Sequence, residues 1–81
     1  MRVAFIDAAD SSISDTVVFV EAAKVFCLPD EKRVVIHTVD GISFISCAEI
    51  DYEEYLEMTK NLLSYGFLDL TNNSFIYYSD L

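Results

Sequence analysis

The paired carboxylates and the single histidine are the first candidates for acid–base chemistry in this chain, and their pattern does not indicate catalysis. General acid–base catalysis needs a carboxyl group in a cleft with a shifted pKa. Here Glu53, Glu54 and Glu57 share the outer face of an expected helix, where carboxylates are solvated. His37 has no evident nucleophile or orienting acid, so we expect it to be a core or half-buried residue. We therefore expect a protein that is not an enzyme.

Metal binding is the second chemistry to consider. A zinc site needs four nitrogen or sulfur ligands at suitable spacing. The chain has one histidine and two cysteines, and Cys27 and Cys47 stand twenty positions apart. We expect no metal ion and no cofactor, and we expect both thiols to be reduced and buried or half-buried. A ligand-binding β-face near His37 and Cys47 is a third hypothesis, without a pocket signal of its own.

A polar segment near the end of the chain is a better candidate for recognition than for catalysis. The sequence GFLDLTNNSFI, residues 66–76, joins an expected helix end to an expected strand. It carries Asp69, Asn72, Asn73 and Ser74, a set that suits either a recognition loop or a solvated turn.

The net charge restricts the partners. Fourteen acidic residues against five basic ones give a net charge of −9. Phosphate binding relies on Lys and Arg that displace counterions, so this charge disfavours DNA and anionic membranes. The chain is 53% hydrophobic, with no apolar run near the roughly 20 residues of a spanning helix. We expect one cytoplasmic domain, residues 1–81, that contacts a protein partner or forms a homodimer.

The expected elements must position these residues. Strands are predicted at 1–6 (an edge strand), 16–20, 24–28, 33–39, 42–46 and 75–78, with a bend or bulge at 21–23. A helix is predicted from Asp51 to Gly66. Asp51 and Glu54 form a pair similar to a capping box, and Gly66 suits the left-handed position after the helix. The predicted apolar stripe of this helix is Tyr52, Tyr55, Leu56, Thr59, Leu62 and Leu63.

The hairpin is predicted from Asp40-Gly41, a dipeptide typical of a two-residue type I′ turn. That turn pairs Val39 with Ile42 and His37 with Phe44 on one face of the hairpin. Aromatic residues gather after it, and tyrosine is enriched at protein interfaces. We therefore take Tyr77 and Tyr78, together with the helix positions Glu53 and Glu57, as candidate interface residues.

The order of these pieces resembles the LytTR domain, the DNA-binding domain of many bacterial response regulators. The matching motifs are VVFVEA (17–22), HTVDG (37–41), the spaced leucines Leu56, Leu62 and Leu63, and Gly66-Phe67, within residues 16–78. The resemblance implies an α+β, mostly β fold of antiparallel strands with one principal amphipathic helix. It also implies a role in transcription regulation.

The chain departs from the family after Gly66-Phe67, where relatives carry arginines that contact DNA. Asp69 stands at the first arginine position, Asn72 and Asn73 occupy the region of the second, and Ser74 matches the family serine. Aspartate inverts the charge that a phosphate or guanine contact needs. We therefore expect a small bacterial or phage regulatory domain that acts through protein contact, as a homodimer or as an antagonist of a DNA-binding protein. The alternative is a sequence-specific DNA-binding regulator of the LytTR type.

Overall fold

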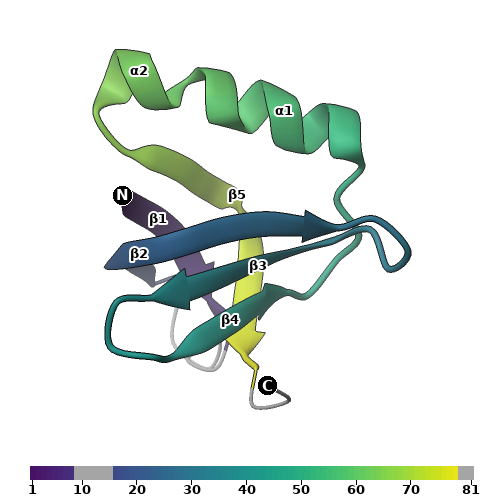
Figure 1. Cartoon of the computed structure of the whole chain (residues 1–81), viewed down its shortest axis with the longest axis horizontal. Coiled ribbons are helices and arrows are strands. Elements are labelled where there is room, and N and C mark those ends of the chain that lie inside the picture. The colour runs from purple at the N-terminus through teal and green to yellow at the C-terminus, as the bar shows by residue number, and fades with distance from the viewer. Residues whose placement is uncertain (9–15, 79–81) are drawn as a thin grey trace.

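The chain folds into a small β-barrel with one principal helical segment. The computed structural model describes residues 1–8 and 16–78 (Figure 1). The strands are β1 (Arg2–Asp7), β2 (Val17–Leu28), β3 (Arg33–Thr38), β4 (Ser43–Ser46) and β5 (Leu68–Tyr77), and the helices are α1 (Tyr52–Lys60) and α2 (Leu62–Tyr65). The predicted α+β, mostly β fold class is confirmed.

The sheet closes on itself in the order β1-β2-β3-β4-β5. Neighbouring strands are antiparallel except for β1 and β5, which run parallel. An odd number of strands that alternate in direction must close with one parallel pair. The prediction that residues 1–6 form an edge strand is therefore wrong, because β1 pairs with β2 on one side and with β5 on the other. Closure gives each of the described strands a neighbour on both sides, which reduces the exposed sheet edge that promotes aggregation.

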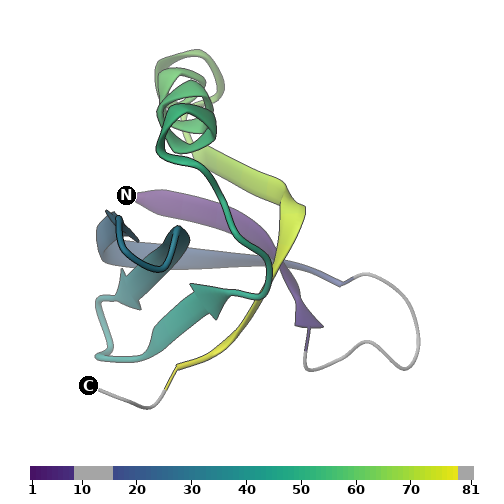
Figure 2. The ribbon, with the colours of Figure 1, turned by 90° about the vertical axis from the view of Figure 1, so that its right-hand side faces the viewer.

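Strand β2 is one continuous strand, although the sequence predicts two. Residues 17–21 pair with β1, and most of the remaining residues pair with β3 after a register shift between Ala22 and Lys24. A bulge at this point bends the strand, so a single strand can turn the corner between two neighbours of the barrel. Figure 2 shows the sheet curving around the core.

The interior is filled by aliphatic side chains and a cluster of three phenylalanine rings. The ring of Phe5 (β1) lies 4.9 Å from that of Phe44 (β4) and 5.3 Å from that of Phe75 (β5), measured between centroids. Ile50, in the connection after β4, is also fully buried, and its N–H donates to the carbonyl of Lys32. The buried core residues are Val3, Phe5, Ala22, Val34, Ile36, Ile50, Leu68, Leu70 and Phe75.

The predicted hairpin exists, but its register differs by one residue. The observed partners are Val35 with Ile45, Ile36 with Phe44 and His37 with Ser43. The N–H of Gly41 donates to the carbonyl of Thr38 at 3.1 Å, and Gly41 alone in the loop has a positive φ, of 89°. The loop therefore has three residues, with glycine in the left-handed position of a bulge, rather than a two-residue type I′ turn. This shift places Phe44 towards the core and His37 on the outer face.

The predicted helix is present as α1 and α2, with a break at Asn61. Gly66 has φ of 74° and its N–H donates to the carbonyl of Leu62, as the sequence predicts. Asp51 occupies the N-cap position, but its side chain makes no capping hydrogen bond; its carboxylate lies 3.9 Å from the ammonium of Lys32. The predicted capping box is therefore wrong.

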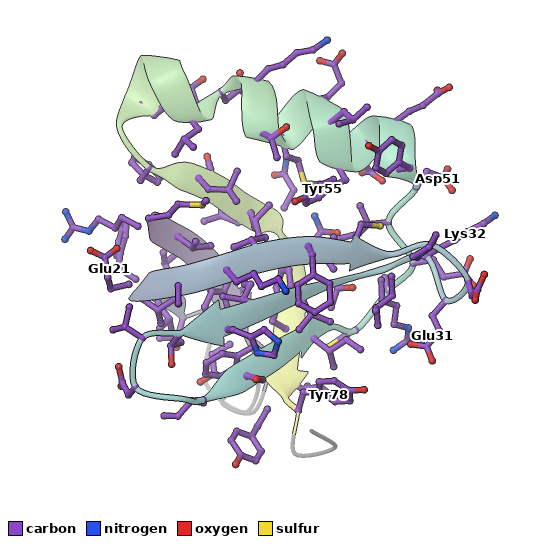
Figure 3. The ribbon with its side chains drawn as sticks, in the orientation of Figure 1. Glu21, Glu31, Lys32, Asp51, Tyr55 and Tyr78 are labelled. Atoms are coloured by element: carbon purple, nitrogen blue, oxygen red, sulfur yellow. The ribbon has the colours of Figure 1, made fainter. Side chains whose placement is uncertain are left out.

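The predicted apolar stripe of the helix is right for Tyr55 and Leu62 and wrong for Tyr52 and Leu56, and the side chain of Leu63 lies outside the described part of the structure. Tyr55, Met58 and Leu62 pack against the core, whereas Tyr52 and Leu56 are exposed. The hydroxyl of Tyr55 donates to the carbonyl of Val25 in β2, and burial raises the pKa of this phenol. No residue of α1 is fully buried, so the helix rests on the barrel through half-buried contacts (Figure 3).

Candidate functional site

The polar segment of residues 69–74 forms an irregular part of β5. Along β1, Phe5 is paired with Leu70 whereas the next residue, Ile6, is paired with Ser74. Residues 71–73 are therefore looped out of the parallel ladder. β-bulges often re-aim side chains beside functional sites, which makes this part of β5 a candidate recognition segment.

Asp69 is held by its own neighbour. Its Oδ1 accepts hydrogen bonds from the Thr71 hydroxyl at 2.6 Å and the Thr71 N–H at 3.0 Å. These two hydrogen bonds lower the pKa of the Asp69 carboxyl below its ordinary value, and the bond from the hydroxyl has the larger effect. The carboxylate is therefore charged in the folded protein near neutral pH, and it repels an approaching phosphate.

The two amides do not present a common surface. Asn72 is exposed, whereas Asn73 and Ser74 are half-buried. The Nδ2 of Asn73 is buried without a hydrogen-bond partner among the residues that the structure describes. The carbonyl of Ser74 accepts from the N–H of Cys47 at 2.9 Å and so ties the end of the bulge to β4. Only Asn72 of this set stands free to face a partner.

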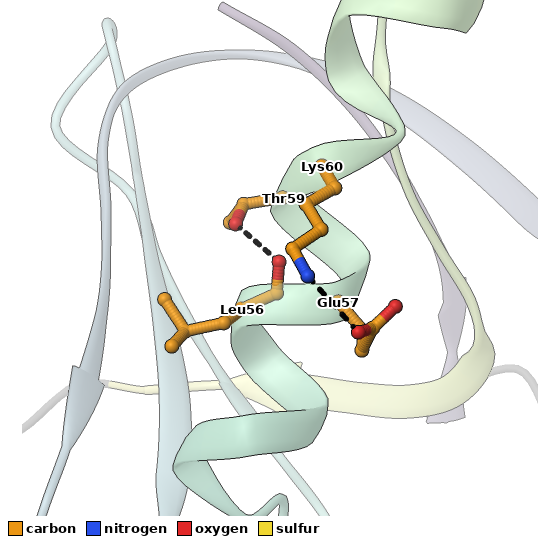
Figure 4. A network of polar contacts seen from close by, with 4 residues as sticks. All are labelled: Leu56, Glu57, Thr59 and Lys60. Atoms are coloured by element: carbon orange, nitrogen blue, oxygen red, sulfur yellow. Dashed lines mark hydrogen bonds and ion pairs between the residues drawn. The ribbon is translucent and has the colours of Figure 1, made fainter.

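A groove of about 370 Å³ lies between the helical segment and the bulge of β5. We call it the acidic groove; its lining residues are Glu54, Glu57, Met58, Asn61, Tyr65, Asp69 and Asn72. It brings the predicted residues Glu57, Asp69 and Asn72 together. Glu57 also pairs with Lys60 at 3.1 Å, on the exposed side of α1 (Figure 4). This single cation does not balance three carboxylates.

Beside the groove, three aromatic rings form a cluster: Phe19 lies on β2, Tyr65 ends α2, and Phe67 lies in the connection before β5. Phe19 of β2 meets Phe67 at 5.8 Å between centroids, and Phe67 meets Tyr65 at 6.1 Å. We call these three residues the aromatic ridge. Phe19 is 53% exposed and Tyr65 is 57% exposed. Sequence reasoning missed this site; the outward position of Phe19 between core-packed Val18 and Val20 is the one signal that could have revealed it.

The remaining candidate interface residues line neither the acidic groove nor the aromatic ridge. Tyr77 is 63% exposed at the far end of β5. Tyr78 is half-buried and lines a separate hollow of about 280 Å³ with Leu28, Pro29, Asp30 and Glu31. Figure 3 shows Tyr78 at the end of the barrel away from α1. Glu53 is exposed on α1 and is not among the residues that line the acidic groove, although it lines an adjoining hollow with Glu54 and Glu57.

His37 and the cysteines have structural surroundings. The Nδ1 of His37 shares a hydrogen bond with the hydroxyl of Ser43, and its ring lies 5.2 Å from that of Phe26. Cys27 is half-buried, and burial raises the pKa of its thiol, which disfavours a reactive thiolate. Cys47 is exposed, so the prediction that both thiols are buried or half-buried is wrong for this residue.

The basic residues do not gather beside the polar segment. Lys24 lies over Phe26, Lys32 and Arg33 flank the turn between β2 and β3, and Lys60 ends α1. Arg2 lies over the ring of Phe19, with its guanidinium carbon 5.3 Å from the centroid. Within residues 1–8 and 16–78, therefore, the cations are distributed over several elements rather than in one patch.

No group of three or more His, Cys, Asp and Glu side chains in the described part of the chain is arranged to hold a metal ion. None of the helices described is long and apolar enough to cross a membrane. Comparison with protein-family models, with curated proteins and with solved structures gives no match for this chain.

Proposed function

We propose that this domain is a small regulatory module, LytTR-like in its sequence motifs, that acts through contact with another protein rather than through ordinary DNA binding. The observation that carries the proposal is the aromatic ridge, because Phe19 and Tyr65 are each more than half exposed and Phe67 joins their rings into one cluster. Exposed aromatic groups that touch one another commonly mark protein interfaces.

The electrostatics support a protein partner over DNA. At the DNA-facing positions implied by the family resemblance, the chain has a charged aspartate and two amides, and one of those amides is half-buried. The neighbouring groove adds Glu54 and Glu57. Polar side chains that read bases need nearby cations to hold the phosphate backbone, and this surface provides carboxylates instead.

A fluorescence anisotropy titration with labelled random duplex DNA at low salt tests the proposal. We expect no saturable binding at micromolar protein. Micromolar or tighter binding that weakens steeply with added salt would contradict it and favour the alternative, a DNA-binding regulator. In that case Asn72→Ala should change the sequence preference, whereas Lys32→Ala should weaken binding to all sequences alike.

A further inference from the structure

The aromatic ridge and the acidic groove form one continuous surface. Tyr65 belongs to both, since it lines the groove and its ring meets that of Phe67. A second connection runs through the sheet, because Ala4 of β1 is paired with Phe19 of β2 on one side and with Asp69 of β5 on the other. Paired residues point to the same face of a sheet, so Phe19 and Asp69 both face outward.

The surface therefore offers an apolar end and an anionic end at a defined spacing. Ala4, which is paired with both, is buried, so neighbouring side chains cover it between the two ends. Two strand spacings separate Phe19 from Asp69, a distance of about 10 Å. Two turns of an α-helix rise by about the same distance, 10.8 Å.

This chemistry selects a cationic partner. A second copy of the chain, itself with a net charge of −9, would bring more carboxylates to the groove. Nucleic acid would bring phosphates. A Lys or Arg side chain would meet Glu54, Glu57 and Asp69, with the ring of Tyr65 beside them for a cation–π contact. Arg2 over the ring of Phe19 already shows, within the chain, that a ring of this ridge accepts a cation.

We infer that the surface made of the aromatic ridge and the acidic groove is a docking site for a basic amphipathic helix of another protein. The partner's apolar side chain packs on Phe67 and on the part of Phe19 that Arg2 leaves exposed, and a Lys or Arg about two turns away enters the groove. This inference rests on the proposed function and specifies its partner. A basic helix is also what many DNA-binding proteins present to DNA, so an acidic antagonist of such a protein would need a surface of this kind.

The test uses the full chain and three fluorescein-labelled synthetic helical peptides. The first carries leucine on one face and lysine on the other. The second has glutamine in place of leucine, and the third has glutamate in place of lysine. We expect the lysine–leucine peptide to bind, the lysine–glutamine peptide to bind about tenfold more weakly for the loss of apolar anchors, and the glutamate–leucine peptide not to bind. Equal affinity for the first two peptides would overturn the inference, because charge alone would then explain binding.

Matched variants locate the site. Phe19→Ala should weaken lysine–leucine binding by roughly tenfold, whereas Tyr77→Ala, which removes an aromatic residue of similar exposure at the far end of β5, should leave it unchanged. Glu54→Gln should weaken binding by roughly threefold and its neighbour Glu53→Gln, outside the groove, should not. If Phe19→Ala does not fold by circular dichroism, Tyr65→Ala provides the same test.

The outcomes separate the docking site from the proposed function. Peptide binding that is unaffected by Phe19→Ala and Tyr65→Ala, or absent altogether, overturns the docking site and leaves a protein-contact function at another surface. A dimer in light scattering that Phe19→Ala converts to a monomer also overturns it, since a second copy would then be the occupant. Salt-sensitive binding of duplex DNA overturns the proposed function itself.

Discussion

The residues at the bulge of β5 show how local hydrogen bonds set the chemistry of a surface. Asp69 stands just before residues 71–73, which are looped out of the ladder. Its carboxylate is kept ionised by both donors of Thr71, two positions along the chain. An aspartate with a lowered pKa stays anionic in mildly acidic solution. The acidic groove therefore keeps this negative charge at pH values at which a histidine would become protonated.

The link between Thr71 and Asp69 predicts a measurable pH effect. Thr71→Val removes the hydroxyl donor and keeps both the N–H donor and the branched shape, so the pKa of Asp69 should rise towards its ordinary value. Because the folded-state pKa is lowered, the stability that this pair contributes is present above the ordinary aspartate pKa of about 3.9 and is lost as the pH falls through the lowered value. NMR titration of the Asp69 side-chain carboxyl measures the shift.

The control for this variant is Thr59→Val, which removes a hydroxyl that donates to the carbonyl of Leu56 on α1 (Figure 4). It should leave the Asp69 titration unchanged. An unchanged Asp69 pKa in Thr71→Val would mean that the backbone N–H alone holds the carboxylate.

At the scale of elements, the loop between β3 and β4 decides which side chains enter the core. The dipeptide Asp40-Gly41 predicts a two-residue loop, but the observed loop has three residues. The extra residue shifts the pairing of β3 with β4 by one position. The shift places Val34, Ile36 and Phe44 with the core cluster and turns His37 and Ser43 away from it. A one-residue change of register moves an entire face of a strand, so the loop geometry matters more than the propensity of any residue in it.

Two single substitutions distinguish the observed loop from the two-residue turn. Gly41→Ala should destabilise the protein by about 1–2 kcal/mol, because an L-residue is strained in the left-handed region. Asp40→Ala should change stability by less than about 0.5 kcal/mol, because Asp40 does not have a positive φ. Urea unfolding followed by circular dichroism measures both. A similar large loss for both variants would instead indicate a type I′ turn, in which both central residues need positive φ.

At the scale of the whole molecule, closure of the barrel depends on contacts between residues far apart in the sequence. Phe5 lies in the first strand, and it touches Phe44 and Phe75 from the two last strands. The parallel pairing of β1 with β5 returns the chain to its start after the helical segment. This closure brings Phe19 of β2 and the start of β5 to the same outer wall, and so it assembles the proposed docking surface.

The aromatic contact at the closure predicts a large effect on global stability. Phe75 is fully buried, so Phe75→Ala should cost about 3–5 kcal/mol, a large part of the total for a domain of this size. Tyr77→Ala, two positions later and largely exposed, should cost less than about 0.5 kcal/mol. Thermal unfolding measures both. Similar melting temperatures for the two variants would contradict the closed packing of Phe75 between strands.

The sequence by itself determined the features that depend on near neighbours. The alternating β-branched runs, the helix from Asp51 to Gly66 and the glycine at its end are local patterns, and the fold class follows from them. Asp69, Asn72 and Glu57 could be selected as candidates because their charge and polarity are visible without coordinates.

Only the tertiary structure decided which residues lie next to those candidates in space. The bulge in β2, the hairpin register and the face of α1 that meets the barrel all depend on which strands pair, because such choices minimise exposed apolar surface over the whole chain. The aromatic ridge combines residues 19, 65 and 67, which no local pattern connects. Closure of the barrel brings these three residues together. Because Tyr65 also lines the acidic groove, the ridge and the groove form one surface.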